Sequence, residues 1–140
     1  MIARPAVPTL PWTAPSGATA PTGGRIEVMA SAFTLTSRRH TFRMMRVSMA
    51  LRKSVLTSPG ALGISLVARP LRRQYYTLSS WTDRAALDAF VRTSLHREAM
   101  RTLGPAMATG RFTFWQVGAD APAPTWEAAH ERLAAEPDRA

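Results

Sequence analysis

The sequence predicts an α+β fold of the ferredoxin-like class, in which two helices cover one face of a four-stranded antiparallel sheet. Segments with the alternation typical of strands and segments with helical periodicity follow one another in the order β-α-β-β-α-β. The chain breakers Pro59-Gly60 and Gly104-Pro105 end the two helical segments. A chain of 140 residues is long enough for one domain with a single core.

The first strand is predicted over residues 25–35, RIEVMASAFTL, where both faces are fairly apolar, as in a central strand. Ser37 is then placed to cap a helix within RRHTFRMMRVSMALRKSVL. Its core-facing stripe is predicted from apolar residues that recur at helical spacing, Phe42, Met45, Met49 and Leu56. The arginines of this segment then occupy much of the remaining surface of the helix.

Two further strands are predicted as a hairpin. The segment ALGISLVARP alternates larger apolar residues with small ones and ends at Pro70. After the short basic turn LRR, the segment QYYTLSSW is rich in β-forming residues. The alternation puts Tyr76 and Leu78 on one face of this strand, and Tyr75, Thr77 and Trp81 on the other.

A second helix is predicted from a cap at Thr82 or Asp83 to about Leu103. His96 lies on one stripe of this helix together with the small residues Ala85 and Ala89. These small residues would let the helix approach the sheet closely, so His96 is expected at a cavity between helix and sheet. A structural role stays open. A lone histidine on an apolar helix face is more often a packed residue than a catalyst, and a tryptophan before a helix, such as Trp81, is usually a packing anchor.

The segment RFTFWQV is predicted as the last strand, with Phe112 and Phe114 opposite Trp115 and Val117. The domain is thus expected to span residues 25–117. Residues 1–24, rich in proline, alanine and threonine, are expected to be a disordered tail. Residues 118–140 are expected to be a tail with an optional short helix in TWEAAHERLAAE.

The sheet face away from the two helices also needs a cover. Four residues are candidates for this face: Trp115, Tyr75, Thr77 and Val67. A common solution is that two protomers pack sheet on sheet, which removes an exposed apolar face from water. The sequence therefore predicts a homodimer.

Composition excludes several kinds of site. The chain has no cysteine, so disulfides and thiolate chemistry are excluded, and a metal would rely on His40, His96, His130 or carboxylates. No segment approaches the roughly 20 apolar residues that span a bilayer, so we expect a cytoplasmic protein without a membrane partner. Residues 25–117 carry 15 basic and 4 acidic residues, a net charge of +11. Of the 18 basic residues in the chain, 17 are arginine, which favours bidentate binding of carboxylate or phosphate.

The order of elements, together with SPGALGISLVARP, YYTLSSW, DRAALDAFVRTSLHREAM and FTFWQV, resembles the antibiotic-biosynthesis monooxygenase-like family of dimeric α+β barrel proteins. The likeness is greatest to its small bacterial members of uncharacterised function. It extends more distantly to the haem-degrading monooxygenases and spheroidene monooxygenase, and it covers about residues 25–117. The resemblance implies a barrel formed by two protomers, each of which encloses one pocket between helices and sheet.

The resemblance also implies site residues. In the haem-degrading relatives a histidine on the helix after the third strand ligates the haem iron, and His96 matches that position. Arg43 and Arg46 are then candidates for binding the haem propionates. In the cofactor-free quinone-forming relatives an asparagine, a tryptophan and a histidine act on an aromatic substrate and oxygen. Trp81 and His96 match two of these roles as catalytic residues, but this chain contains no asparagine.

Three functions follow from these observations. The first is a monooxygenase-like oxidoreductase that acts on a small hydrophobic or aromatic substrate between helices and sheet, with haem left open as a cofactor. The second is a ligand-binding barrel protein without catalysis. The third is a basic nucleic-acid-binding module, which ranks last because the aromatic residues fall at strand positions assigned to the interior and no nucleic-acid-binding motif is present.

Overall fold

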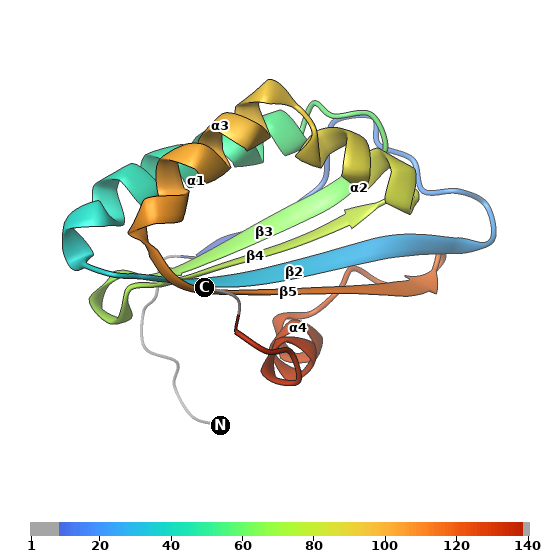
Figure 1. Ribbon diagram of the computed structural model, residues 1–140. Helices are drawn as coiled ribbons and strands as arrows, with labels where there is room; N and C mark the ends of the chain where they lie inside the picture. The colour runs from blue at the N-terminus through green and yellow to red at the C-terminus, as the bar shows by residue number, and fades with distance from the viewer. Residues whose placement is uncertain (1–8, 139–140) are drawn as a thin grey trace.

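One antiparallel sheet of five strands, in the order β1-β3-β4-β2-β5, organises the computed structural model, which describes residues 9–138 (Figure 1). The strands are β1 (Thr9–Thr13), β2 (Arg25–Leu35), β3 (Ala61–Arg69), β4 (Gln74–Trp81) and β5 (Met107–Gly118). The helices are α1 (Thr41–Val55), α2 (Arg84–Val91), α3 (Ser94–Leu103) and α4 (Trp126–Ala134). Short 3-10 turns join them at Arg38–His40, Pro70–Arg72 and Gly104–Ala106. From β2 to β5 the order of strands and helical segments is the predicted one.

The predicted four-strand count is wrong because β1 adds a fifth strand at the edge of the sheet. It pairs with β3, with Leu10 opposite Leu66, inside the segment expected to be disordered. Gly63 makes this docking possible, since a Cβ at that position would lie 2.2 Å from the indole ring of Trp12. The sequence TLPWT gave no sign of a strand, because Pro11 interrupts it. The part of the predicted tail before Thr9 lies outside the described residues.

Helix α1 packs on the sheet only in part through the predicted stripe. Phe42 is 74% exposed and Met49 is 45% exposed, whereas Met45 and Leu56 pack against the core. The side chains that face the sheet are Met44, Val47, Leu51 and Val55. Both stripes are apolar and lie on opposite sides of the helix, so periodicity alone could not choose between them.

The predicted second helix is two helices, α2 and α3. The backbone of Thr93 leaves the helical region (φ −64°, ψ 153°), and its hydroxyl accepts a hydrogen bond from the backbone N–H of His96 at 3.3 Å. Thr93 is therefore an N-cap, a role for which threonine is well suited. The break moves His96 from the end of one long helix to the first turn of α3.

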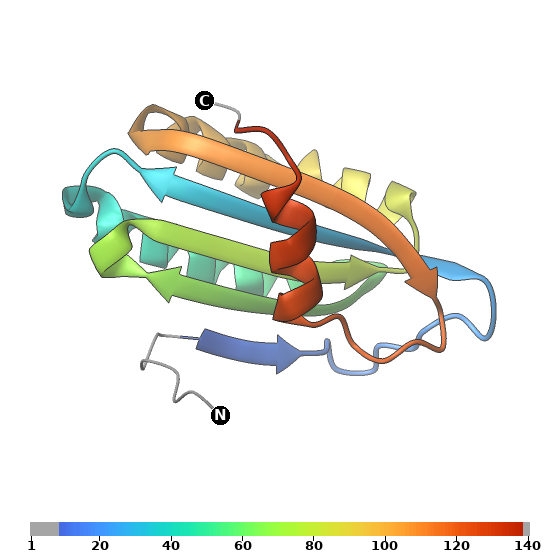
Figure 2. The same cartoon turned by 90° about the horizontal axis from the view of Figure 1, so that it is seen from below.

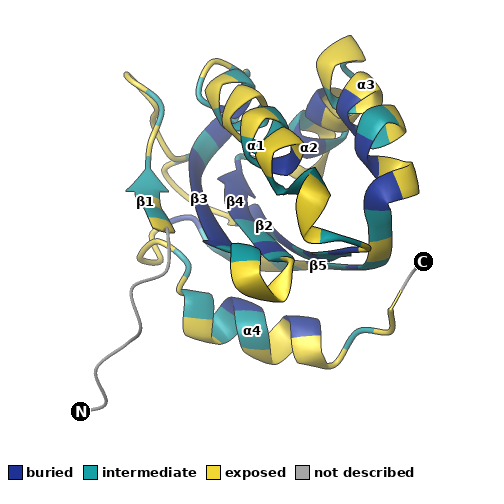
Figure 3. Ribbon diagram, turned by 90° about the vertical axis from the view of Figure 1, so that its left-hand side faces the viewer, coloured by how far each residue is buried: buried dark blue, intermediate teal, exposed yellow. Residues whose placement is uncertain are grey.

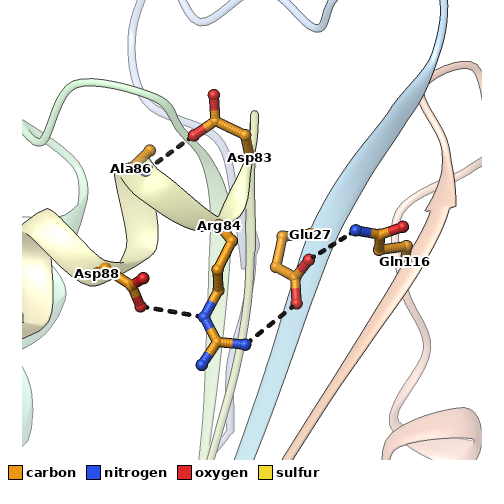
Figure 4. Close-up of polar contacts among 6 residues, drawn as sticks. All are labelled: Glu27, Asp83, Arg84, Ala86, Asp88 and Gln116. Carbon is orange, nitrogen blue, oxygen red and sulfur yellow. Dashed lines mark hydrogen bonds and ion pairs between the residues drawn. The ribbon is translucent and has the colours of Figure 1, made fainter.

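A buried carboxylate holds the start of α2 to the sheet (Figure 4). Glu27 on β2 is 5% exposed; it accepts a hydrogen bond from Gln116 and lies 3.7 Å from the Arg84 guanidinium. Arg84 also pairs with Asp88 at 3.0 Å, while Asp83 caps α2 as predicted, through the Ala86 N–H. Charged groups buried in this way need such partners.

Helix α4 crosses the sheet face opposite α1, α2 and α3 (Figure 2). Its Ala129 and Leu133 pack on Val28, Ala30 and Leu78, which together form a separate core cluster. The optional helix of the tail is thus part of the fold.

Two of the residues predicted for the face that α4 covers lie on the other face. Tyr75 packs in the core under α1, and Thr77 bonds to Ser31 on the same side. Trp115 and Val67 do lie on the α4 face: Arg132 of α4 stacks over the Trp115 ring at 4.7 Å, and Val67 pairs with Tyr76. The buried strands lie between the two helical layers (Figure 3).

A hydrogen-bond relay ties α4 and β1 to β3. The indole N–H of Trp126 donates to the Ser65 hydroxyl at 3.0 Å, and that hydroxyl donates to the carbonyl of Leu10 at 2.8 Å. Ser65 is buried, so both bonds form away from water. Within residues 9–138, no helix has the length and apolar character needed to cross a bilayer.

Candidate functional site

A cavity of about 70 Å³ lies between α1, α3 and the helix-facing side of the sheet, and His96 lines it. Most of the lining is apolar and comes from residues such as Met44, Leu51 and Leu103. The polar groups in the lining are few and come from four elements: Ser31, Ser48, Arg52, Thr77, Ser79 and His96. An apolar cavity with a few convergent polar groups is the usual form of a small-molecule site.

The environment of His96 keeps its imidazole neutral. The side chain is half-buried and meets the Phe90 ring edge-on, with centroids 5.3 Å apart and the planes at 73°. Burial lowers the pKa of His96 below its ordinary value of 6.5, because a charged imidazole is poorly solvated in apolar surroundings. Across the described residues 9–138, no side chain hydrogen-bonds the imidazole. A neutral, unengaged imidazole can accept a proton from a bound ligand.

Trp81 does not share this cavity with His96. Its side chain is fully buried in the core beneath α2, where its indole N–H donates to the Ser79 hydroxyl at 3.0 Å. The Phe90 ring packs against the indole with the centroids 5.3 Å apart, and it also meets the His96 ring at 5.3 Å. Trp81 thus packs against Phe90, which in turn contacts His96. The Trp81 ring itself does not reach a ligand in the cavity.

Arg43 and Arg46 also lie apart from His96. Both are exposed on α1, neither lines the cavity, and the Arg46 guanidinium stacks over the Phe42 ring at 5.2 Å. The arginine that does line the cavity is Arg52, from the last turn of α1. Its Nη2 donates to the Thr13 hydroxyl of β1 at 3.1 Å, and its buried Nε has no hydrogen-bond partner within the described part of the chain. Sequence reasoning missed Arg52, although its spacing of four from Ser48 and eight from Met44 places it on the same side of the helix.

The residues around His96 do not fit a haem. The cavity of about 70 Å³ is far smaller than the roughly 300 Å³ at the lower end for small-molecule pockets. The two arginines expected to bind propionates point elsewhere, so the suggested ligand set is not assembled. A metal ion held by several side chains has no site within residues 9–138 either. The described residues contain no group of three or more histidine, aspartate or glutamate side chains placed to bind a metal ion. Of the other two candidate histidines, His130 packs with Tyr76 and Trp126 on the α4 face, and His40 ends the 3-10 turn before α1.

A second cavity of about 220 Å³ adjoins the first along α1 and reaches β1 at the edge of the sheet. The two cavities share Met44, Ser48, Leu66 and Thr77 in their linings. Met45, Met49 and Leu10 add flexible apolar side chains to the second. The two volumes taken together come close to the roughly 300 Å³ at which small-molecule pockets begin, and the shared Met44 is a flexible side chain.

Comparison with known proteins supports the fold. No protein-family model matches the sequence, and no curated protein matches it. Solved structures do match. A protein from Nitrosomonas europaea named as an antibiotic biosynthesis monooxygenase has a TM-score of 0.58 at 13% identity, over 74% of this chain and 97% of its own. A similarly named protein from Caulobacter crescentus CB15 has a TM-score of 0.55 at 24% identity, over 71% and 92%.

A larger protein from Lactobacillus acidophilus NCFM, named as a monooxygenase, has a TM-score of 0.60 at 9% identity over 70% of this chain. The present chain spans only 47% of that protein, about half of its length. The fold is therefore that of the antibiotic-biosynthesis monooxygenase-like proteins, as the resemblance in the sequence predicts. At these identities the likeness concerns the fold and carries no activity with it.

Proposed function

We propose that the chain is a monooxygenase-like oxidoreductase that acts on a small hydrophobic or aromatic substrate bound between the helices and the sheet. The observation that carries the proposal is the half-buried His96, kept neutral by burial at the wall of an apolar cavity. The fold shared with proteins named as monooxygenases gives supporting context. Haem is not included, because the surroundings of His96 do not fit it.

The chemistry that suits this site begins with proton transfer. His96 removes the proton from a hydroxyl of a phenolic substrate, and the positive charge of Arg52 in the same lining favours the resulting anion. The phenolate then reacts with molecular oxygen. One oxygen atom of O₂ bonds to a ring carbon, which loses its hydrogen and becomes a carbonyl. The other oxygen atom leaves as water. A phenol and O₂ thus give a quinone and water without an external reductant. The apolar lining excludes bulk water from the reactive anion.

Oxygen uptake tests this proposal. Purified protein is supplied with a panel of phenols and quinols in an oxygen-electrode cell, and quinone formation is followed by absorbance. His96→Gln should lower kcat about 100-fold or more, as expected for loss of a general base. His130→Gln is the matched control, since His130 lies on the α4 face. Oxygen uptake that is equal in the wild type and His96→Gln would remove His96 from the reaction.

A second function, binding of a hydrophobic ligand without catalysis, is favoured by the burial of Trp81. The ring matched to a catalytic role is 0% exposed and does not line the cavity. If the wild type consumes no oxygen with any member of the panel, while a hydrophobic fluorescent probe binds with equal affinity to the wild type and His96→Ala, this second function replaces the first.

A further inference from the structure

Six exposed arginines gather at one end of the molecule, here called the basic end. They come from the start of α1 with its preceding turn and from the β3–β4 hairpin: Arg38, Arg39, Arg43, Arg46, Arg72 and Arg73. The two segments lie at the same end of the sheet (Figures 1 and 2). Two hydrogen bonds fix this arrangement. The Arg73 guanidinium donates to the Thr36 carbonyl at 3.0 Å, and the Arg73 carbonyl accepts from the Leu35 N–H at 2.9 Å. The basic end is therefore a built surface, not a loose tail.

The two segments that form the basic end contain no acidic residue. Between Glu27 and Asp83 the sequence contains nine basic residues and no aspartate or glutamate. The ion pairs among the described residues use Arg84, Arg101 and Arg111, and none of them uses an arginine of the basic end. The six arginines thus have no ion-pair partner within residues 9–138, and their positive charge can act on something outside the chain.

The two most exposed large apolar side chains of the described residues lie among these arginines. Phe42 is 74% exposed and Leu71 is 79% exposed, next to Arg43 and Arg72 respectively. Leu71 also lines a shallow hollow of about 400 Å³ together with Arg38, Arg72 and Arg73. Single exposed apolar residues are ordinary on protein surfaces. An aromatic and an aliphatic side chain, both exposed next to arginines of the basic end, form the pattern that suits a lipid headgroup layer.

We propose that the basic end docks on the surface of an anionic lipid membrane. The arginines bind the headgroup phosphates, and Phe42 and Leu71 enter the boundary between headgroups and acyl chains. No spanning helix is needed for such binding, so the absence of a span in the sequence does not oppose it. A nucleic acid would share the attraction to arginine and could stack on Phe42, but an aliphatic Leu71 offers it no stacking surface. The proposal is independent of the reaction at His96.

Vesicle sedimentation tests the docking surface. Full-length protein is mixed with vesicles of phosphatidylcholine alone, or of phosphatidylcholine with about one quarter phosphatidylglycerol, at low and at physiological salt. The wild type should bind only the anionic vesicles. Arg38→Glu with Arg72→Glu should weaken this binding at least about 100-fold, because four charge units near the surface change. Phe42→Ser with Leu71→Ser should weaken it about tenfold or more and leave a binding that salt removes more easily.

A matched pair of substitutions controls for net charge. Arg92→Glu with Arg97→Glu changes the same number of charges at exposed positions outside the basic end, and should lower the affinity less than about fivefold. Circular dichroism melting confirms that every variant folds. The proposal is overturned if this control loses as much binding as the Arg38 and Arg72 variant, or if neutral and anionic vesicles bind equally. A preference for nucleic acid would also overturn it. That result would be tighter binding to duplex DNA than to the anionic vesicles, together with wild-type binding of DNA and vesicles by the Phe42→Ser with Leu71→Ser variant.

Discussion

His96 shows how burial prepares a side chain for chemistry. Its position in the first turn of α3 sets the imidazole between Phe90 and the cavity, and the apolar contacts there disfavour the charged form. Within α3 the spacing of seven from the buried Leu103 does place His96 on the inward side. The small residues predicted to let this stripe approach the sheet, Ala85 and Ala89, are instead exposed on α2. The break at Thr93 could not be placed from periodicity, although threonine is among the residues preferred as an N-cap.

The lowered pKa of His96 predicts how stability depends on pH. In the folded state the imidazole gains its proton only below its ordinary value of 6.5, so between the folded pKa and 6.5 the unfolded chain binds more protons. The free energy of unfolding from this group therefore rises with pH up to about 6.5 and is constant above it. His96→Leu should remove this contribution. Urea denaturation from about pH 5 to about pH 8 should show the wild type losing more stability than His96→Leu as the pH falls. Parallel profiles for the two proteins would contradict the buried, neutral imidazole.

Trp81 is predicted to act on stability. The indole fills the core beneath α2 and uses its N–H on Ser79. Trp81→Ala should cost about 3–5 kcal/mol of unfolding free energy, since it leaves a large cavity. Trp115→Ala, at a half-buried ring, should cost less. Chemical denaturation of both variants measures the difference, and a Trp81→Ala variant as stable as Trp115→Ala would show that the ring is not a core anchor.

At the scale of elements, the sequence was informative where one face of a segment differs from the other. The alternation in β4 correctly puts Tyr76 and Leu78 on the face opposite Tyr75. In α1 two opposite stripes are apolar, and the choice between them depends on tertiary packing: Met44 and Val55 are buried while Phe42 is exposed. The missed strand β1 depends on a single distant glycine, Gly63, whose role appears only once the two segments are paired.

Gly63 should control the docking of β1. A methyl group at this position would overlap the Trp12 indole, which must move for the strand to stay paired. Gly63→Ala should therefore raise amide hydrogen exchange in residues 9–13 with little change in β2 and β5. Gly104→Ala is the control, because a Cβ there meets nothing within 4 Å. Unchanged protection of β1 in Gly63→Ala would mean that the indole contact does not hold the strand.

For the whole molecule, α4 changes the reason for a homodimer. The sequence predicts a dimer because one face of the sheet needs a cover, and α4 supplies a cover over Val28, Ala30 and Leu78. The dimer stays a prediction. The apolar surface that a second protomer would cover is now limited to the parts of this sheet face that α4 leaves open. The sequence could not place α4 on the sheet, since a nine-residue helix after a proline-rich link gives no sign of where it packs.

Removal of α4 from the sheet should promote self-association. Ala129 is fully buried, so Ala129→Glu would place a carboxylate against Val28 and Leu78 and displace the helix. Sedimentation velocity should then show larger species than the wild type at equal concentration. Ala134→Glu, at an exposed position of the same helix, should leave the sedimentation unchanged. If Ala129→Glu sediments as the wild type does, the face under α4 is not a latent interface.

The proposed function depends on a neutral His96 that faces a cavity able to bind a small aromatic ligand. The most direct test is an NMR titration of the histidine ring protons with and without added phenol, with the His96 signal assigned from His96→Gln. We expect a pKa below 6.5 for His96 and a change in its signal when phenol is added. A pKa at or above 6.5, with a signal that phenol does not affect, would contradict it.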